Sequence, residues 1–134
     1  MAVKPKTFYE KELDRISQTH LLLEHLYIQI RQSKAFMEQH HSAKIELDNM
    51  AAAAFMSRFY YIRIFKQVYG VTPRQYLRDL RISKAKELLT QGFPVTQVCY
   101  DVGYDSLPTF SSAFKRGTGY SPKEYQKMNK GNLE

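Results

Sequence analysis

Apolar residues recur at helical spacing along most of this chain. No glycine or proline occurs between Thr7 and Tyr69, so the pattern predicts that this region is mostly helical, with a first helix ending near His41. A seam of positions within that helix alternates in steps of four and three over about four heptads. Such a helix either packs back on its own domain or pairs two copies of the chain, and the pattern leaves both interpretations open. The seam comprises Tyr9, Leu13, Ile16, His20, Leu23, Tyr27, Ile30, Lys34 and Met37.

Residues 72–89 carry the most complete helix signal. Thr72 is expected to be the N-cap, Pro73 suits the first helical position, and Gln75 falls where a capping box needs it. No glycine or proline follows until Gly92, so about 17 residues can form one helix of roughly 25 Å. Its apolar residues cover a broader arc than the stripe of a surface helix, which predicts contact with a body on each side.

The segments on either side of this helix repeat each other. Residues 56–76 and 105–125 align without a gap at an offset of 49, and aromatic, glycine, proline and cap positions coincide. Just upstream the offset is 48, so the second copy carries one extra residue in its turn. The repeat predicts two copies of one helical unit, joined by the intervening helix. The matched pairs include Phe65 with Phe114, Gly70 with Gly119, Pro73 with Pro122 and Tyr76 with Tyr125.

The first copy is expected to consist of a short helix, a tight turn and a second helix. Asp48 is expected to cap a helix over residues 49–54, and Ser57 to cap another over residues 58–69. Phe55 lies in the turn, where a small residue or glycine is more usual. Phe55 must therefore avoid a positive φ or accept the strain of one.

The second copy has the same plan. Residues 95–102 are the expected first helix, and Gly103 provides the turn. Asp105 or Ser106 caps the second helix, in which Pro108 is tolerable only because it lies in the first turn. This layout is that of a helix-turn-helix, which places its second helix in the DNA major groove.

Charge changes the picture, because the basic excess gathers in this region. The 134 residues carry a formal net charge of +7 and a pI near 9.5. Residues 1–30 are neutral, with four basic and four acidic side chains, whereas residues 31–134 hold sixteen and nine. A basic concentration beside a candidate recognition helix favours phosphate as a ligand, and a merely solvated basic surface is the alternative.

Other chemistries find little support in the sequence. Cys99 is the only cysteine, so an internal disulfide is excluded, and the four histidines lack the spacing of a metal site. No nucleophile–base set or glycine-rich phosphate loop occurs, so neither an enzyme nor a cofactor is expected. No signal peptide is evident and the run Leu21–Leu23 is too short for a membrane span, so a cytoplasmic protein without membrane contact is expected.

The stretch from Ile45 to Tyr125 resembles the AraC/XylS family of transcriptional regulators. The motifs in the first half are Leu47-x-x-Met50-Ala51, Met56-Ser57, Arg63-x-Phe65-Lys66, Gly70-x-Thr72-Pro73-x-x-Tyr76 and Arg81-x-x-x-Ala85-x-x-Leu88-Leu89. Those in the second half are Val102-Gly103-Tyr104-x-Ser106, Phe110-x-x-x-Phe114-Lys115 and Gly119-x-Ser121-Pro122-x-x-Tyr125. The resemblance implies an all-α, seven-helix DNA-binding domain with two lobes, and a role in transcription initiation.

The resemblance also suggests a division of the chain. Residues 1–30 form an N-terminal tail and helix, and residues 31–134 the DNA-binding domain. Within that domain, residues 31–72 are the first helix-turn-helix unit, 73–89 the linker helix and 90–134 the second unit. Only about 30 residues precede this DNA-binding domain, too few for a sugar-binding barrel, so no effector domain is expected.

The family correspondence places Phe59, Ile62 and Arg63 on the base-facing side of the first recognition helix. Arg63 is expected to pair with guanine, worth about 1–3 kcal/mol of discrimination, while Phe59 and Ile62 meet thymine methyl groups. Arg58 and Lys66 are candidates for phosphate. Two alternatives remain open: Arg63 is a surface cation or phosphate contact, and Phe59 is covered by the N-terminal helix.

In the second recognition helix, Leu107, Pro108, Ser111 and Ser112 match DNA-facing positions of the family. Ser112 stands where the family commonly has an arginine that reaches DNA. We therefore expect this helix to add phosphate and methyl contacts more than base hydrogen bonds, with Lys115 on phosphate.

Together these features predict a sequence-specific DNA-binding regulator whose two recognition helices enter successive major grooves, about 34 Å apart. Its expected partners are double-stranded DNA and RNA polymerase, with a homodimer through the N-terminal helix as one interpretation of the seam. The alternative is a helical protein-interaction module that binds DNA weakly.

Overall fold

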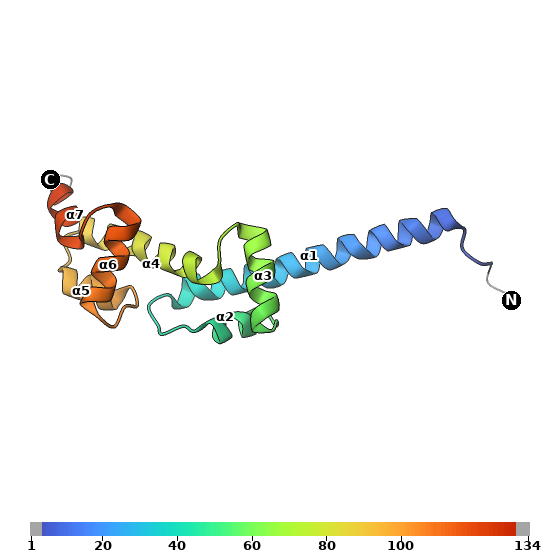
Figure 1. Cartoon of the computed structure of the whole chain (residues 1–134), viewed down its shortest axis with the longest axis horizontal. Coiled ribbons are helices and arrows are strands. Elements are labelled where there is room, and N and C mark those ends of the chain that lie inside the picture. Colours follow the sequence, from blue (N-terminus) through green and yellow to red (C-terminus); the bar gives the residue numbers. More distant parts are fainter. Residues whose placement is uncertain (1–3, 131–134) are drawn as a thin grey trace.

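The computed structural model describes residues 4–130, and this part of the chain is all-helical (Figure 1). The expected fold class, two helix-turn-helix units joined by a long helix and preceded by an N-terminal helix, is confirmed. The helices are α1 (Phe8–His40), α2 (Leu47–Ala53), α3 (Arg58–Tyr69), α4 (Pro73–Thr90), α5 (Val95–Asp101), α6 (Leu107–Thr118) and α7 (Pro122–Met128).

Helix α1 is single and continuous, and its first half extends away from the rest of the molecule (Figure 1). Only its C-terminal part is buried, at Ile30, Ser33 and Met37, where it packs on α2 and α3. The prediction that it ends near His41 is confirmed, since His41 is the C-cap. The proposed boundary between residues 30 and 31 falls inside this helix, and the domain division stays a prediction.

Two separate hydrophobic cores flank α4. Leu77 of α4 belongs to the core of the first unit, whereas Ile82, Ala85 and Leu89 belong to the core of the second. The predicted contact with a body on each side is therefore confirmed. The expected capping box is present as well, since the Gln75 side chain accepts from the N-cap backbone N–H at 2.9 Å.

The first helix of the first unit begins differently from the expectation. Its N-cap is Glu46, whose backbone N–H donates to the side-chain oxygen of Asn49 at 2.9 Å. The prediction that Asp48 caps this helix is wrong, because Asp48 lies within the first turn and its carboxylate binds Arg58 instead. In the second unit Ser106, rather than Asp105, is the cap of α6.

The turns of the two units have the same backbone hydrogen bonds. The N–H of Phe55 donates to the Ala52 carbonyl at 3.0 Å, and that of Gly103 donates to the Tyr100 carbonyl at 3.1 Å. Phe55 adopts a φ of 57° and Gly103 a φ of 108°. Phe55 therefore accepts the left-handed conformation, with its side chain 79% exposed.

Candidate nucleic-acid interface

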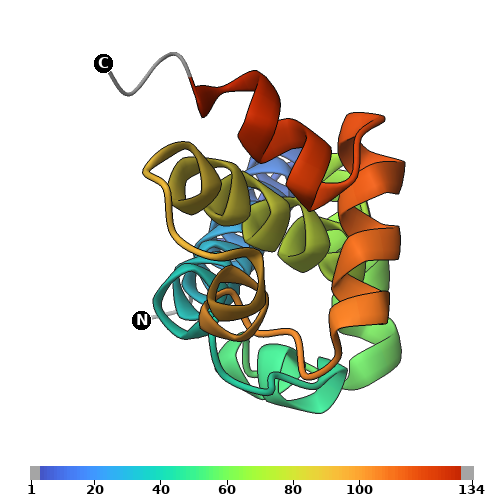
Figure 2. The ribbon, with the colours of Figure 1, turned by 90° about the vertical axis from the view of Figure 1, so that its left-hand side faces the viewer.

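Helices α3 and α6 are the second helices of their units and lie on the same side of the molecule (Figure 2). Each ends at a glycine in the left-handed conformation, Gly70 with φ 77° and Gly119 with φ 86°. Their inner faces are anchored by fully buried aromatic rings. Because these faces are fixed in the cores, the outer faces are presented to solvent on a rigid frame. The anchoring rings are Tyr61 and Phe65 in α3, and Phe110 and Phe114 in α6.

The predicted base-facing residues of α3 differ in exposure. Phe59 is 83% exposed, so the alternative that the N-terminal helix covers it is wrong. Arg63 and Lys66 are exposed too, and the Arg63 guanidinium lies 5.3 Å from the centroid of the Tyr60 ring. Ile62 is half-buried against the first core and presents only part of its surface.

Arg58, a predicted phosphate contact, is engaged within the protein. Its guanidinium donates to both carboxylate oxygens of Asp48, at 2.8 and 2.6 Å. These hydrogen bonds hold the pKa of Asp48 below its usual value and raise the pKa of Arg58. An anion that approaches Arg58 must therefore compete with a carboxylate on α2.

The predicted residues of α6 share one accessible face. Pro108, Ser112 and Lys115 are exposed, Leu107 is 37% exposed, and Ser111 is half-buried. In the described part of the chain the Ser112 hydroxyl has no hydrogen-bond partner, so it is free to meet a ligand.

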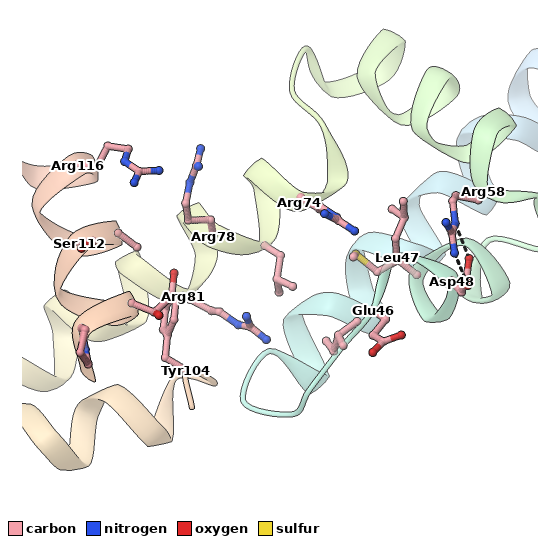
Figure 3. A pocket seen from close by; sticks show the side chains of 16 residues that line it. Glu46, Leu47, Asp48, Arg58, Arg74, Arg78, Arg81, Tyr104, Ser112 and Arg116 are labelled. Carbon is pink, nitrogen blue, oxygen red and sulfur yellow. Dashed lines mark hydrogen bonds and ion pairs between the residues drawn. The ribbon is translucent and has the colours of Figure 1, made fainter. Parts of the chain in front are cut away.

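A groove of about 930 Å³ lies between the two units, along α4 (Figure 3). Pro108 and Ser112 line it from α6, and Arg58 from the start of α3. The groove is rich in arginine, contributed mainly by α4 and α6, and Glu46 and Asp48 are its acidic residues. Its arginines are Arg58, Arg74, Arg78, Arg81 and Arg116.

Three of these arginines were missed as site residues by the sequence reasoning. Within residues 4–130, the guanidinium groups of Arg74, Arg78 and Arg116 form neither an ion pair nor a hydrogen bond. These three like charges share a groove and repel one another, and neither acidic residue of the groove pairs with them, so the arrangement favours an anion. Residues 58–86 hold eight basic side chains and a single acidic one, a pattern that indicates Arg74 and Arg78. The place of Arg116 in the groove is evident only from the folded structure.

Arg81 occupies a different part of the groove. Its Nε donates to the His41 carbonyl at 2.9 Å and an Nη donates to the Ala43 carbonyl at 3.0 Å. Its guanidinium carbon lies 5.6 Å from the centroid of the Tyr104 ring. Burial lowers the pKa of Arg81 from its usual value. These contacts bind Arg81 into the protein and leave it less available to a ligand than the other arginines.

Other kinds of site find no support in the described residues. Over residues 4–130, no group of three or more His, Cys, Asp or Glu side chains could hold a metal ion. Cys99 is fully buried, and burial raises the pKa of its thiol. The helices of this part of the chain include none with the length and apolar character needed to cross a bilayer.

Comparison with known proteins agrees with this geometry. The helix-turn-helix domain family matches residues 50–128. The probable transcriptional regulator LumQ of Photobacterium leiognathi is 36% identical over 92 residues, which are 68% of this chain and 37% of LumQ. The chain therefore spans little more than a third of the length of this curated relative.

Two solved structures have the same arrangement of helices. The DNA-binding domain of AdpA, solved in complex with a target DNA, superposes with a TM-score of 0.73 and 28% identity, covering 77% of this chain and 94% of that one. An AraC-type DNA-binding domain regulator from Chromobacterium violaceum has a TM-score of 0.70 and 27% identity, covering 78% and 94%.

Proposed function

This chain belongs to the AraC/XylS family of helix-turn-helix transcriptional regulators, and from that premise we propose that it binds double-stranded DNA sequence-specifically. The family and the fold are those of DNA-binding regulators and not of enzymes. One observation carries the proposal: α3 and α6 face the same side, and unneutralised arginines line the groove between them. Two helices held in this way can enter successive major grooves of one duplex.

In the first unit we assign base readout to α3. Arg63 carries five donors in a fork that matches the O6 and N7 acceptors of guanine. Phe59 lacks donors and is well exposed, which suits a thymine methyl group, and the exposed edge of Ile62 extends that apolar surface. Lys66 lies one turn further along the helix and is assigned to phosphate.

The second unit is assigned a weaker share of base readout. Leu107 and Pro108 offer only apolar contacts, and the hydroxyls of Ser111 and Ser112 are short. Lys115 is exposed near the end of α6 and is assigned to phosphate. The half-site below α6 is therefore expected to be shorter and more tolerant of substitution than the half-site below α3.

The groove between the units is assigned to the sugar-phosphate backbone that joins the two half-sites. Arg74 and Arg78 from α4 and Arg116 from α6 all line this one groove. Guanidinium groups bind phosphate strongly and without regard to sequence. These residues would position the duplex, and Arg58 would join them once it leaves Asp48.

Selection from a randomised duplex library, followed by a salt series, tests the proposal. An enriched site of about 15–20 base pairs, with two half-motifs one helical turn apart, is the expected result. A single short motif would mean that α6 only holds the backbone. Weak binding without enrichment would contradict the proposal and favour the protein-interaction module, which the comparisons with known regulators do not favour.

A second candidate function concerns the free half of α1. Its seam residues Leu13, Ile16 and Leu23 are all more than half exposed, although seam residues further along the same helix are buried. Exposed apolar residues at heptad spacing suit a second copy of the same helix, so we propose a homodimer through α1. As a regulator acting at promoters, the protein is further proposed to contact RNA polymerase and to work in the cytoplasm.

A further inference from the structure

The two units share α4, but their hydrophobic cores are separate. Among the described residues, each core contains side chains from only one unit together with its own part of α4. A single helix between two bodies can bend, so its stiffness alone sets their mutual angle loosely. We propose that Arg81 is a positioning residue that fixes this angle, by fastening the end of α1 to the turn of the second unit.

The contacts on the side of the first unit are two hydrogen bonds. Arg81 donates to the carbonyl oxygens of His41 and Ala43, at 2.9 and 3.0 Å. Both carbonyls lie just beyond the last turn of α1, where backbone acceptors lack intrahelical donors. The two bonds of one rigid guanidinium hold this stretch of backbone in a fixed orientation relative to α4.

The contact on the side of the second unit is aromatic. The Arg81 guanidinium lies 5.6 Å from the centroid of the Tyr104 ring, a cation–π distance. The Tyr104 ring lies 5.4 Å from that of Phe110, which is fully buried on α6. A continuous chain of contacts therefore joins the end of α1, through Arg81 and Tyr104, to the second recognition helix.

Gly103 supplies independent support. A Cβ atom at Gly103 would lie 2.3 Å from the His41 carbonyl oxygen and 2.8 Å from the Arg81 Nε. The corresponding turn of the first unit has the same hydrogen bonds and a positive φ, yet it accommodates Phe55. Phe55 has the smaller φ, 57° against 108°, and its side chain extends into solvent. At position 103 the backbone conformation favours glycine, and the end of α1 and Arg81 in addition leave no room for a Cβ atom.

We name Arg81, His41, Ala43, Gly103 and Tyr104 the inter-unit latch. Its consequence for function rests on the proposed DNA binding. If α3 and α6 occupy successive major grooves, a fixed angle between the units makes both helices arrive in register. The latch would then determine which spacing of half-sites is accepted, although none of its residues reads a base.

Distances between spin labels test the latch without DNA. Labels at Gln67→Cys and Lys123→Cys, both exposed, report on the two units in a Cys99→Ala background. We expect one narrow distance distribution in the parent protein. Arg81→Ala and Gly103→Ala are each expected to broaden or shift it. Arg81→Ala removes the contacts, whereas Gly103→Ala keeps the guanidinium group but forces it or the His41 carbonyl to move away from the added Cβ atom. An unchanged distribution in both variants would overturn the proposal.

Gly119→Ala is the matched control for Gly103→Ala. It adds the same methyl group at a positive φ of 86°, but nothing lies within 4 Å of the added Cβ atom. Its distance distribution should match the parent protein. Circular dichroism identifies a variant that fails to fold; because the two latch substitutions differ in kind, the folded one still decides the question.

Binding measurements supply the functional arm. The parent protein should bind a duplex with one inserted base pair between the half-sites about tenfold more weakly than the native spacing, because the second contact is lost. The same insertion should lower the DNA affinity of Arg81→Ala less than threefold. This variant should bind a single half-site with the affinity of the parent protein. If the parent protein lacks sequence preference, the proposed function fails, while the spin-label distances still decide the latch.

Discussion

Asp48 is the residue that most directly opposes the proposed interface. Its carboxylate accepts two hydrogen bonds from the guanidinium of Arg58 and adds a negative charge to the groove. Asp48→Asn is therefore expected to raise DNA affinity severalfold at low salt and to steepen the salt dependence by about one phosphate contact. Electrophoretic mobility shifts across a salt series measure both quantities.

Asp79→Asn is the matched control for Asp48→Asn. It changes the net charge equally, on an exposed position of α4 outside the groove lining. If both variants raise affinity by the same factor, only net charge matters, and Arg58 is not held back by its partner.

Arg63 is predicted to read bases. Arg63→Ala should relax sequence preference at one or two base pairs of the first half-site, since it removes about 1–3 kcal/mol of discrimination. Lys66→Ala, on the same helix, should instead weaken all sequences alike, as expected for a phosphate contact. Selection from a randomised library with each variant gives the comparison. A uniform loss in Arg63→Ala would exclude base readout by that side chain.

Tyr61 gives the first core a pH dependence. Its hydroxyl donates to Ser33 at 2.9 Å, and burial raises the pKa of Tyr61 from 10 to about 12. The folded state thus holds this proton more tightly than the unfolded chain. The protonated Tyr61 hydroxyl therefore makes its full contribution to the free energy of unfolding below pH 10, and this contribution is lost as the pH rises to 12.

Tyr61→Phe should remove this contribution and lower the free energy of unfolding by about 1 kcal/mol at pH 8. The loss stays small because the Ser33 hydroxyl still donates to the Ile30 carbonyl. Urea unfolding at pH 8 and pH 11 measures the difference from the parent protein. That difference should shrink at the higher pH. A constant difference would mean that Tyr61 ionises equally in both states.

At the scale of elements, α1 is the helix whose apolar sequence pattern extends further than its packing against the rest of the protein. Its seam continues for about four heptads, but the first unit uses only the last part of it. A helix without tertiary contacts is marginal in water, so the free half is expected to gain stability from a partner. The proposed homodimer supplies one.

Sedimentation equilibrium tests this dimer directly. The parent protein should dimerise at concentrations on the order of tens of micromolar, whereas Ile16→Glu, which places a charge in the seam, should remain a monomer. Gln18→Glu, on another face of the same helix, is the control. A parent protein that stays monomeric over this range would remove the hypothesis.

At the scale of the whole molecule, the arginine groove makes the two units one binding surface. Each of Arg74→Gln, Arg78→Gln and Arg116→Gln should lower the slope of log affinity against log salt by about 0.9, the value for one phosphate contact in B-DNA. Sequence preference should not change. Lys11→Gln lies in the first part of α1, outside the groove lining, and should leave the slope unaltered. An equal effect there would mean that DNA affinity depends only on the overall charge of the protein.

The helices, most of their caps and the repeat could be predicted from the sequence, because these features depend on residues close together in the chain. Thr72, Pro73 and Gln75 specify the start of α4 through bonds that span three residues. Gly70 and Gly119 end the two recognition helices for an equally local reason, since glycine enters the left-handed conformation at little cost. The family motifs consist of the same local signals, which is why the fold class was predictable.

Contacts between side chains far apart in the sequence are evident only from the folded molecule. The partner of Asp48 is ten residues away, and Arg81 reaches back about forty residues to the end of α1. The groove arginines come from two helices whose distance depends on how both units pack on α4. No periodicity encodes such contacts, because they depend on the angle between rigid bodies. Gly103 combines both levels: its turn was evident from the sequence, but the approach of His41 that requires glycine was not.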